Sequence, residues 1–437
     1  MMGWLSSRIC NSIADNANLH MNTPANISDF TGQLTTAQFK NKLTGMLLLG
    51  GYGDALGAPH EKEGITGKAG NPENVARLPS FRDYNRETAH PWDIWYDPET
   101  IDAEKRGMPT DDTAFRVTIL HQWLSRIAED DDAPTEKQFL RWLKGAPKPA
   151  ADAPLWQQTR HDQIRDWLAM FEDGETLRYA PNRYTVSENN PFFRKDAPVV
   201  FGTFMYLELA AVYASCPVND VFTTFNGFAS LDQSYGRFVS GMKMAMLAQA
   251  LTAAPTDKSF DEWFFETADS ILDSDLGDPE TRAMVKSHFV AAAQIGRNSQ
   301  KLTETDFMVQ LKQVFDQQLP QSTSEEHREG FRSFDPLLFL KMMAAAVAYS
   351  DGDVRKALRV LAVAPGDSDT MASQLGSLAG AWSGDIALRK LDTIFASDLN
   401  QVQSCIKDQF GIETSDLADS LIELAHKHGC CQKLEIA

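Results

Sequence analysis

The chain has 437 residues, of which 43% are hydrophobic and 23% charged, the composition of a soluble globular protein that can bury a large core. A formal net charge of −19 excludes the broad basic face that binding to a nucleic-acid backbone requires. The chain also lacks the run of roughly 18 apolar residues that a transmembrane helix needs. We therefore expect neither a nucleic-acid partner nor a membrane span.

The first 34 residues differ from the remainder of the chain. They are rich in Asn, Ser and Thr and contain only a short apolar cluster that includes Trp4, Leu5 and Ile9. Such a segment cannot bury enough apolar surface to fold alone, but it can become ordered on a partner. We expect residues 1–34 to be an N-terminal extension that serves as a partner-binding arm, and residues 35–437 to form the folded domain.

The first predicted helix begins at Thr35, where Thr35 and Gln38 have the spacing of a capping box. Apolar residues recur at helical spacing from Phe39 to Leu47, which predicts a helix that reaches Gly50. The residues from Gly50 to Ala58 are nearly all small, so another backbone or a ligand can approach them closely.

Two carboxylates follow in the segment from Gly53 to Glu61. Asp54 lies between small residues and can simply fix a turn. Glu61 follows Pro59 at the mouth of a loop, and we favour it as the working acid or metal partner.

The first acidic cluster is Thr110-Asp111-Asp112-Thr113, at the start of a helix predicted to run to about residue 127. Such residues are the preferred helix caps, so capping alone is one interpretation. Because capping needs only one of them, the doubled Asp favours a second interpretation. In the second interpretation, the carboxylates and hydroxyls of the cluster bind a hard divalent cation, which prefers oxygen ligands.

Downstream, nearly every periodic segment has helical spacing, and alternating strand patterns with hairpin turns are essentially absent. No Pro/Gly/Ser-rich linker divides the chain. The sequence therefore predicts an all-α protein that can form a single large domain, with helical segments at residues 139–143, 167–171, 200–212, 238–251, 263–272, 337–348 and 354–363.

The second acidic cluster is Gly366-Asp367-Ser368-Asp369-Thr370, directly after Pro365. Asp367 and Asp369 are two residues apart on a tight turn, where both can face one ion, and Thr370 adds a hydroxyl. A helix rich in Gly and Ala follows, which suggests close packing. A ligand site explains this cluster better than capping does.

Taken together, three segments resemble the ADP-ribosylglycohydrolase family, the dinitrogenase-reductase-activating and ADP-ribosylarginine hydrolase group. Residues 45–61 resemble its opening helix and its G-D-A-L-G-A-P-x-E signature. The first acidic cluster resembles its T-D-D-T, and the second resembles its G-D-x-D-T followed by G-x-x-x-G-A. The resemblance spans roughly residues 40–385, and neither the first 34 residues nor the tail after about residue 400 has a counterpart in it.

The resemblance implies a single compact multi-helix domain that binds two Mg²⁺ (or Mn²⁺) ions through Thr110, Asp111, Asp112, Asp367, Asp369 and Thr370. Glu61 would act beside them as the catalytic acid or base. The implied reaction is hydrolysis of the bond between ADP-ribose and a modified side chain, most often arginine. Two departures from the family are Pro365, where a small residue is frequent, and Ala229-Ser230-Leu231-Asp232, which lacks the His of a Thr-His-x-Asp segment.

Two further interpretations stay open at this point. Immunity proteins against ADP-ribosylating toxins include members on this fold with an added N-terminal arm, so the chain resembles a protein that occludes a cognate transferase. The other interpretation is a catalytically inactive scaffold, but the intact acidic residues argue against it. Five cysteines without a CxxC pair, Cys10, Cys216, Cys405, Cys430 and Cys431, indicate free thiols and a cytoplasmic location.

Overall fold

The computed structural model describes residues 34–75, 77–79, 104–110, 112–114, 116–117, 120–121, 203, 206–228, 235–253, 258–317 and 332–428. These residues belong to the compact unit Gln33–Ala437. Residues 1–33 of the predicted extension and the predicted helical segments at 139–143 and 167–171 lie outside the described part.

Every described element is a helix, which confirms the all-α prediction. The α-helices are α2 (Thr36–Gly57), α3 (Glu61–Ile65), α8 (Val218–Asn226), α9 (Tyr235–Thr252), α10 (Phe260–Leu272), α11 (Pro279–Asn298), α12 (Glu304–Asp316), α14 (Pro336–Ser350), α15 (Val354–Leu361), α16 (Ser368–Ser383), α17 (Asp385–Arg389), α18 (Thr393–Phe410) and α19 (Thr414–His428). Three short 3₁₀ helices are η1 (Ala58–His60), η2 (Pro72–Asn74) and η6 (Leu207–Tyr213). Residues 112–114, 116–117 and 120–121 are also helical, and we call this segment the Asp112 helix.

The local signals for helix starts operate as the sequence predicts. Thr35 Oγ1 accepts a hydrogen bond from Gln38 N at 3.2 Å, and Gln38 Oε1 accepts one from Thr35 N at 2.8 Å, which completes the capping box of α2. The predicted helices of α9, α10, α14, α15 and α16 are present. The segment predicted from residue 200 instead ends in the tighter 3₁₀ helix η6.

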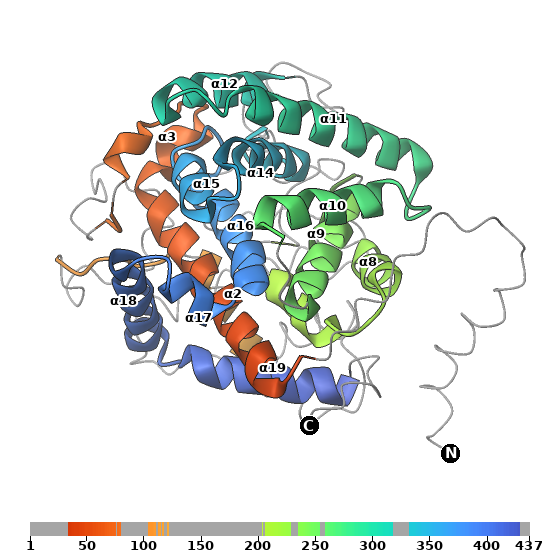
Figure 1. Cartoon of the computed structure of the whole chain (residues 1–437), viewed down its shortest axis with the longest axis vertical. Coiled ribbons are helices and arrows are strands. Elements are labelled where there is room, and N and C mark those ends of the chain that lie inside the picture. The colour runs from red at the N-terminus through yellow and green to blue at the C-terminus, as the bar shows by residue number, and fades with distance from the viewer. Residues whose placement is uncertain are drawn as a thin grey trace, which may run out of the picture. The chain divides into compact units, whose positions relative to one another are not determined.

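Helix α2 reaches Gly50 as predicted and continues to Gly57, and its glycines pack directly on the backbone of α16. A Cβ on Gly53 would lie 2.2 Å from the carbonyl oxygen of Ala372, and one on Gly376 would lie 2.2 Å from that of Leu49. A Cβ on Gly380 would likewise lie 2.1 Å from the carbonyl oxygen of Gly45. The small residues of both helices therefore serve the contact of two backbones, and Figure 1 shows α2 and α16 together near the centre of the unit.

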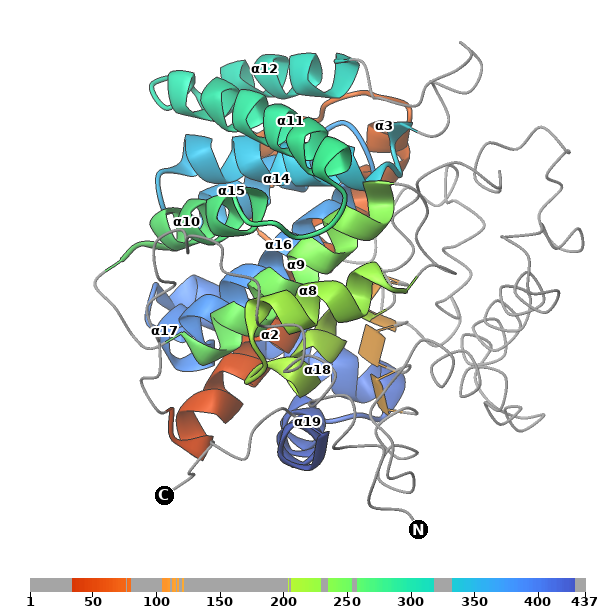
Figure 2. The same ribbon diagram turned by 90° about the vertical axis from the view of Figure 1, so that its right-hand side faces the viewer.

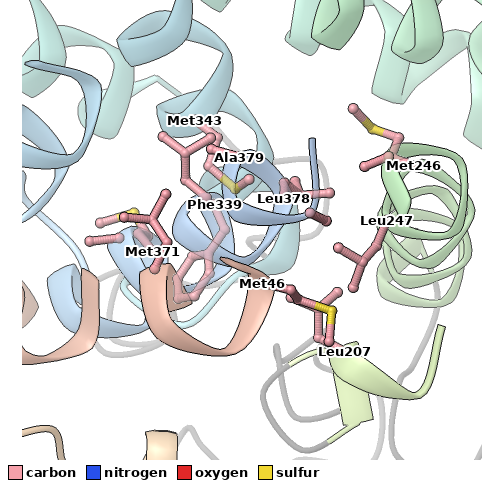
Figure 3. Close-up of a cluster of buried hydrophobic side chains, with 14 of the residues drawn as sticks. Met46, Leu207, Met246, Leu247, Phe339, Met343, Met371, Leu378 and Ala379 are labelled. Atoms are coloured by element: carbon pink, nitrogen blue, oxygen red, sulfur yellow. The ribbon is translucent and has the colours of Figure 1, made fainter. Parts of the chain in front are cut away.

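The hydrophobic core surrounds this helix pair. Figure 3 shows Met46 of α2 beside Leu207 of η6 and Leu247 of α9, while Phe339 and Met343 of α14 approach Met371 and Ala379 of α16. All of these side chains are at most 5% exposed. The acidic residues at the start of α16 are thus attached to a rigid, densely packed support.

The remaining helices cover the central pair from several directions. Helix α11 packs on α14, α8 packs on α9, and α19 contacts both α2 and η6. In both views α11 and α12 lie at one end of the unit and α19 lies at the other (Figures 1 and 2). Among the described helices, none has the length and hydropathy required to cross a lipid bilayer.

The close contact of α2 and α16 predicts a large effect of one methyl group. Gly376→Ala would place Cβ against the Leu49 carbonyl, and neither helix backbone can move away without disturbing the core. We expect the free energy of unfolding to fall by about 3 kcal/mol. Chemical denaturation would measure the loss, with Ser383→Ala at the half-buried end of α16 as the control. A Gly376→Ala protein as stable as the control would contradict the described helix contact.

Candidate functional site

The second acidic cluster forms a glycine turn that leads into α16. Gly366 has φ +117°, a left-handed conformation that favours glycine, and its N–H donates to Gly64 O at 2.8 Å. The N–H of Asp367 donates to Ser333 O at 3.2 Å. Asp367 occupies the N-cap position of α16, yet its side chain makes no capping hydrogen bond. The turn is therefore held by backbone contacts, and the Asp367 carboxylate serves something other than capping.

The first acidic cluster is held by Asp54, which α2 carries to the start of the Asp112 helix. Asp54 Oδ1 accepts hydrogen bonds from the N–H and hydroxyl of Thr110 at 2.9 and 2.5 Å. Asp54 Oδ2 accepts from the N–H and hydroxyl of Thr113 at 2.9 and 2.5 Å. A carboxylate from elsewhere in the chain thus provides the helix cap, so capping does not explain Asp112.

Two threonine hydroxyls connect the two clusters. Thr370 Oγ1 lies 2.8 Å from Asp112 Oδ2 and 3.0 Å from Asp367 Oδ2. A hydroxyl has one proton to donate, so it can satisfy only one of the two carboxylates at a time. Thr110 Oγ1 also lies 3.3 Å from Asp369 Oδ2. Residues more than 250 positions apart in sequence therefore meet in one cluster of oxygen atoms.

Together with Asp54 and Glu61, the two clusters form one site, which we call the acidic cluster. It contains two groups of three carboxylates that share Asp369. Oxygen atoms of Asp54, Asp112 and Asp369 lie within 4.8 Å of one another, and so do those of Glu61, Asp367 and Asp369. Glu61 comes from the first turn of α3 and is half-buried, whereas the four Asp side chains are buried. Asp369 consequently lies between two adjacent positions where oxygen ligands converge.

Burial dominates the electrostatics of the acidic cluster. It raises the pKa of Asp54 from 3.8 to about 6, the charge of Asp369 adds to this shift, and the hydrogen bonds from Thr110 and Thr113 oppose it. Burial also raises the pKa of Asp367 well above its ordinary value, and Asp369, Glu61 and Asp112 contribute further repulsion. Carboxylates that are costly to ionise together need either protons or cations between them.

The structure brings together six of the seven residues selected from the sequence, namely Glu61, Thr110, Asp112, Asp367, Asp369 and Thr370. Asp111, the remaining predicted ligand, and the predicted arm residues Trp4, Leu5 and Ile9 lie outside the described residues.

The sequence predicts only a turn-fixing role for Asp54, whereas in the structure its carboxylate caps the Asp112 helix. Its place in the helical repeat of α2, four residues after Gly50 and one after Gly53, was the available signal, because it sets Asp54 on the face that packs against α16.

The chemistry of this donor set suits a hard divalent cation. All donors are carboxylate or hydroxyl oxygens, and no Cys or His belongs to either group of three. Mg²⁺ and Mn²⁺ prefer such oxygen donors over sulfur and imidazole. Both of Asp54's oxygens already accept two short hydrogen bonds, which assigns it to holding the Asp112 helix in place.

The raised pKa values predict how the protein responds to pH when divalent cations are removed with EDTA. Between about pH 4 and 7 the folded state binds more protons than the unfolded chain, because Asp54, with a pKa of about 6, and Asp367 titrate above their ordinary range. The free energy of unfolding therefore falls as pH rises through this window. We expect the melting temperature to increase by a few degrees Celsius when pH is lowered from 7.5 to 5.5.

The control for this experiment is Asp367→Asn, which removes one of the titrating groups. His60, whose pKa burial lowers, acts in the opposite direction in both proteins. The variant should show a smaller stabilisation at pH 5.5 than the unmodified chain. Identical pH dependence in the two proteins would contradict the raised pKa of Asp367 in the acidic cluster.

The chain is similar to known proteins of one family. The sequence profile of the ADP-ribosylglycohydrolase family matches residues 35–428. A solved structure described as an ADP-ribosylglycohydrolase-related protein complex is 16% identical, covering 89% of this chain and 99% of that chain with a TM-score of 0.49. No match was found among curated proteins.

The extent of the family match corrects one expectation. The tail after about residue 400 was predicted to have no counterpart in the family, yet the match continues through α18 and α19 to residue 428. Both helices pack on α2, the helix that carries Asp54. They are therefore part of the fold that supports the acidic cluster, and with a match over nearly its whole length the chain belongs to the ADP-ribosylglycohydrolase family.

Proposed function

We propose that this chain is a divalent-metal-dependent hydrolase that removes ADP-ribose from modified arginine side chains. Membership of the ADP-ribosylglycohydrolase family supports hydrolase activity on ADP-ribose. The observation that carries the finer proposal is the pair of three-carboxylate groups that share Asp369. Because Asp54 holds the Asp112 helix, Asp112 and Asp369 remain as ligands in the first group. They lie beside Glu61 and Asp367 of the second group, an arrangement suited to two cations, Mg²⁺ or Mn²⁺.

In this proposal, Thr110, Asp112, Asp367, Asp369 and Thr370 hold the ions together with Asp111. Ions held there would help these residues orient the ribose hydroxyls and a water molecule, and would stabilise charge in the transition state. Hydrogen bonds from Thr110 and Thr113 to Asp54 keep the first cluster in place before substrate arrives. The oxygen atoms are thus arranged in advance, which limits the reorganisation that the reaction requires.

Glu61 is our candidate for the proton-transferring group. It is half-buried at the edge of the acidic cluster, whereas Asp367 and Asp369 are buried within it. A carboxylate in this position can take a proton from the attacking water and return it to the departing nitrogen. Water adds its hydroxyl to the anomeric carbon, the bond from that carbon to the guanidinium nitrogen breaks, and free ADP-ribose and unmodified arginine result.

The substrate in this proposal is an ADP-ribosylated protein, and the location is the cytoplasm. The two cysteines in the described part of the chain, Cys216 and Cys405, are buried free thiols. Free thiols are the usual state in a reducing compartment and support this location.

Removal of single carboxylates from the acidic cluster tests the proposed reaction. Asp112→Ala and Asp369→Ala should each lower the rate of ADP-ribose release from ADP-ribosylarginine roughly 100-fold or more, because each removes charge stabilisation from the reacting centre. Release is measured with excess Mg²⁺ by chromatography of the free ADP-ribose. The matched control is Asp353→Ala, which removes an exposed acidic cap at the start of α15.

Circular dichroism distinguishes lost chemistry from lost fold in these variants. Both should keep their helical signal, and excess Mg²⁺ or Mn²⁺ should raise the melting temperature of the unmodified chain more than theirs. Full activity in both variants would refute the assignment of these residues. Release of ADP-ribose only from serine-linked substrates would refute the arginine proposal alone.

A second proposal concerns residues 1–34. The family match begins at residue 35, so this segment is additional to the family's core. Its Asn-, Ser- and Thr-rich composition with apolar Trp4, Leu5 and Ile9 suits a segment that becomes ordered on a partner. We propose that it occludes the active site of a cognate ADP-ribosyltransferase, such as a toxin, so that the chain acts as an immunity protein.

Truncation separates the two proposals. Deleting residues 1–34 should leave ADP-ribose release near that of the full chain, because the acidic cluster lies downstream, but should weaken transferase binding at least about 100-fold by removing its aromatic and aliphatic anchors. Binding is measured by calorimetry against a transferase encoded beside this chain. An Asp112→Ala protein with residues 1–34 intact should still inhibit the transferase stoichiometrically. Equal binding by the truncated and full chains would exclude the arm as an inhibitor.

A further inference from the structure

A buried ion pair lies directly behind the acidic cluster. Arg116 is on the Asp112 helix, four residues after Asp112, and its Nη1 lies 2.9 Å from Oε1 of Glu208 in η6. Their side chains are only 4% and 5% exposed. Charges this deeply buried are costly to remove from water, and an ion pair of this kind often adds little to stability compared with apolar side chains. The function of the Arg116–Glu208 pair is therefore sought in the groups that it holds in position.

The guanidinium of Arg116 joins three further groups by directional hydrogen bonds. Nε donates to the backbone oxygen of Asp112 at 3.1 Å, and Nη1 donates to Ser377 Oγ at 3.2 Å. Nη2 makes a short hydrogen bond to Ser373 Oγ. The planar guanidinium thereby spans the Asp112 helix and α16 in one fixed geometry, which a lysine ammonium could not reproduce.

The two serines extend this network in a consistent donor and acceptor pattern. Ser373 Oγ donates to Gly50 O of α2 at 2.8 Å, and Ser377 Oγ donates to Glu208 Oε1 at 3.0 Å. Ser373 lies one helical turn after Asp369, just as Arg116 lies one turn after Asp112. The network is therefore one turn behind the contact of Thr370 with Asp112 and sets how the two acidic helices meet.

Glu208 contributes its charge as well as its hydrogen bonds. Both of its hydrogen bonds end on Oε1, and Oε2 is buried with no hydrogen-bond partner among the described residues. A glutamine could therefore accept the same two bonds while lacking the negative charge. Without that charge, the cationic guanidinium beside Asp112 would repel any cation held by the acidic cluster.

We propose that Arg116 and Glu208 are positioning residues for the metal site: Arg116 fixes the Asp112 helix against α16, and Glu208 cancels the guanidinium charge that would otherwise oppose cation binding. This inference rests on the proposed metal-dependent function. It assigns two separable effects, one geometric and one electrostatic, to a pair that touches neither substrate nor ion.

Mn²⁺ titration of the full chain tests both effects, with calorimetry for affinity and electron paramagnetic resonance for the uniformity of the ion environment. Glu208→Gln should weaken Mn²⁺ binding on the order of tenfold, since it leaves the guanidinium charge uncancelled. Glu208→Asp keeps the negative charge and should bind Mn²⁺ with an affinity within about threefold of that of the unmodified chain. The double variant Arg116→Met with Glu208→Gln removes both charges and should recover most of the affinity.

Turnover separates the geometric effect from the electrostatic one. The double variant lacks the directional bonds, so at saturating Mn²⁺ its kcat should stay on the order of tenfold or more below that of the unmodified chain, with a broadened resonance spectrum. The matched control is Glu304→Gln, which neutralises one partner of the Arg359–Glu304 pair between α12 and α15, helices that carry no member of the acidic cluster. It should leave Mn²⁺ affinity unchanged.

The outcomes distinguish this inference from the proposed function. If the unmodified chain binds no Mn²⁺, the metal-dependent function fails. If it binds Mn²⁺ and the Glu208→Gln and double variants match it in affinity, spectrum and kcat, the positioning roles are overturned while the function stands. If Glu208→Gln does not fold, the double variant and Glu208→Asp decide the same question, because neither leaves a buried charge without its partner.

Discussion

The backbone contact between α2 and α16 is the constraint on which the candidate site depends. Each helix presents glycines where the other presents carbonyl oxygens, so the two backbones approach more closely than side chains would permit. This contact places Asp54 of α2 beside Asp369 of α16, and their charges interact. The first acidic cluster then attaches to Asp54 through Thr110 and Thr113. A structural device of small residues thus determines where charged residues meet.

The site gathers acidic side chains that are mostly buried. Four buried Asp side chains and half-buried Glu61 converge there, and the pKa values of Asp54 and Asp367 rise in consequence. A fold that only needed stability would gain from apolar residues in these positions, because buried charges without partners are costly. The arrangement is explained by a function that uses the charge, and the family to which the chain belongs acts on ADP-ribose.

The carboxylates of the acidic cluster divide into different tasks according to their hydrogen bonds. Asp54 is occupied by four donors from Thr110 and Thr113 and acts as a helix cap supplied from a distant part of the chain. Asp367 sits at a cap position yet caps nothing, and its oxygen faces the Thr370 hydroxyl. Residue type alone does not reveal such a division, because Asp is equally suited to capping and to metal binding.

The helical class, the capping box at Thr35 and the two acidic clusters could be predicted from the sequence, because they depend on local periodicity and on short motifs. The sequence also predicted catalytic or metal-binding roles for Glu61, Asp112, Asp367 and Asp369, and these four side chains lie in one cluster. Three features become visible only in the folded chain: α2 extends to Gly57, Asp54 holds the first cluster, and Arg116 pairs with Glu208 behind it. These features arise from contacts between residues more than 50 positions apart, which no local pattern encodes, since they exist only once the two backbones have met.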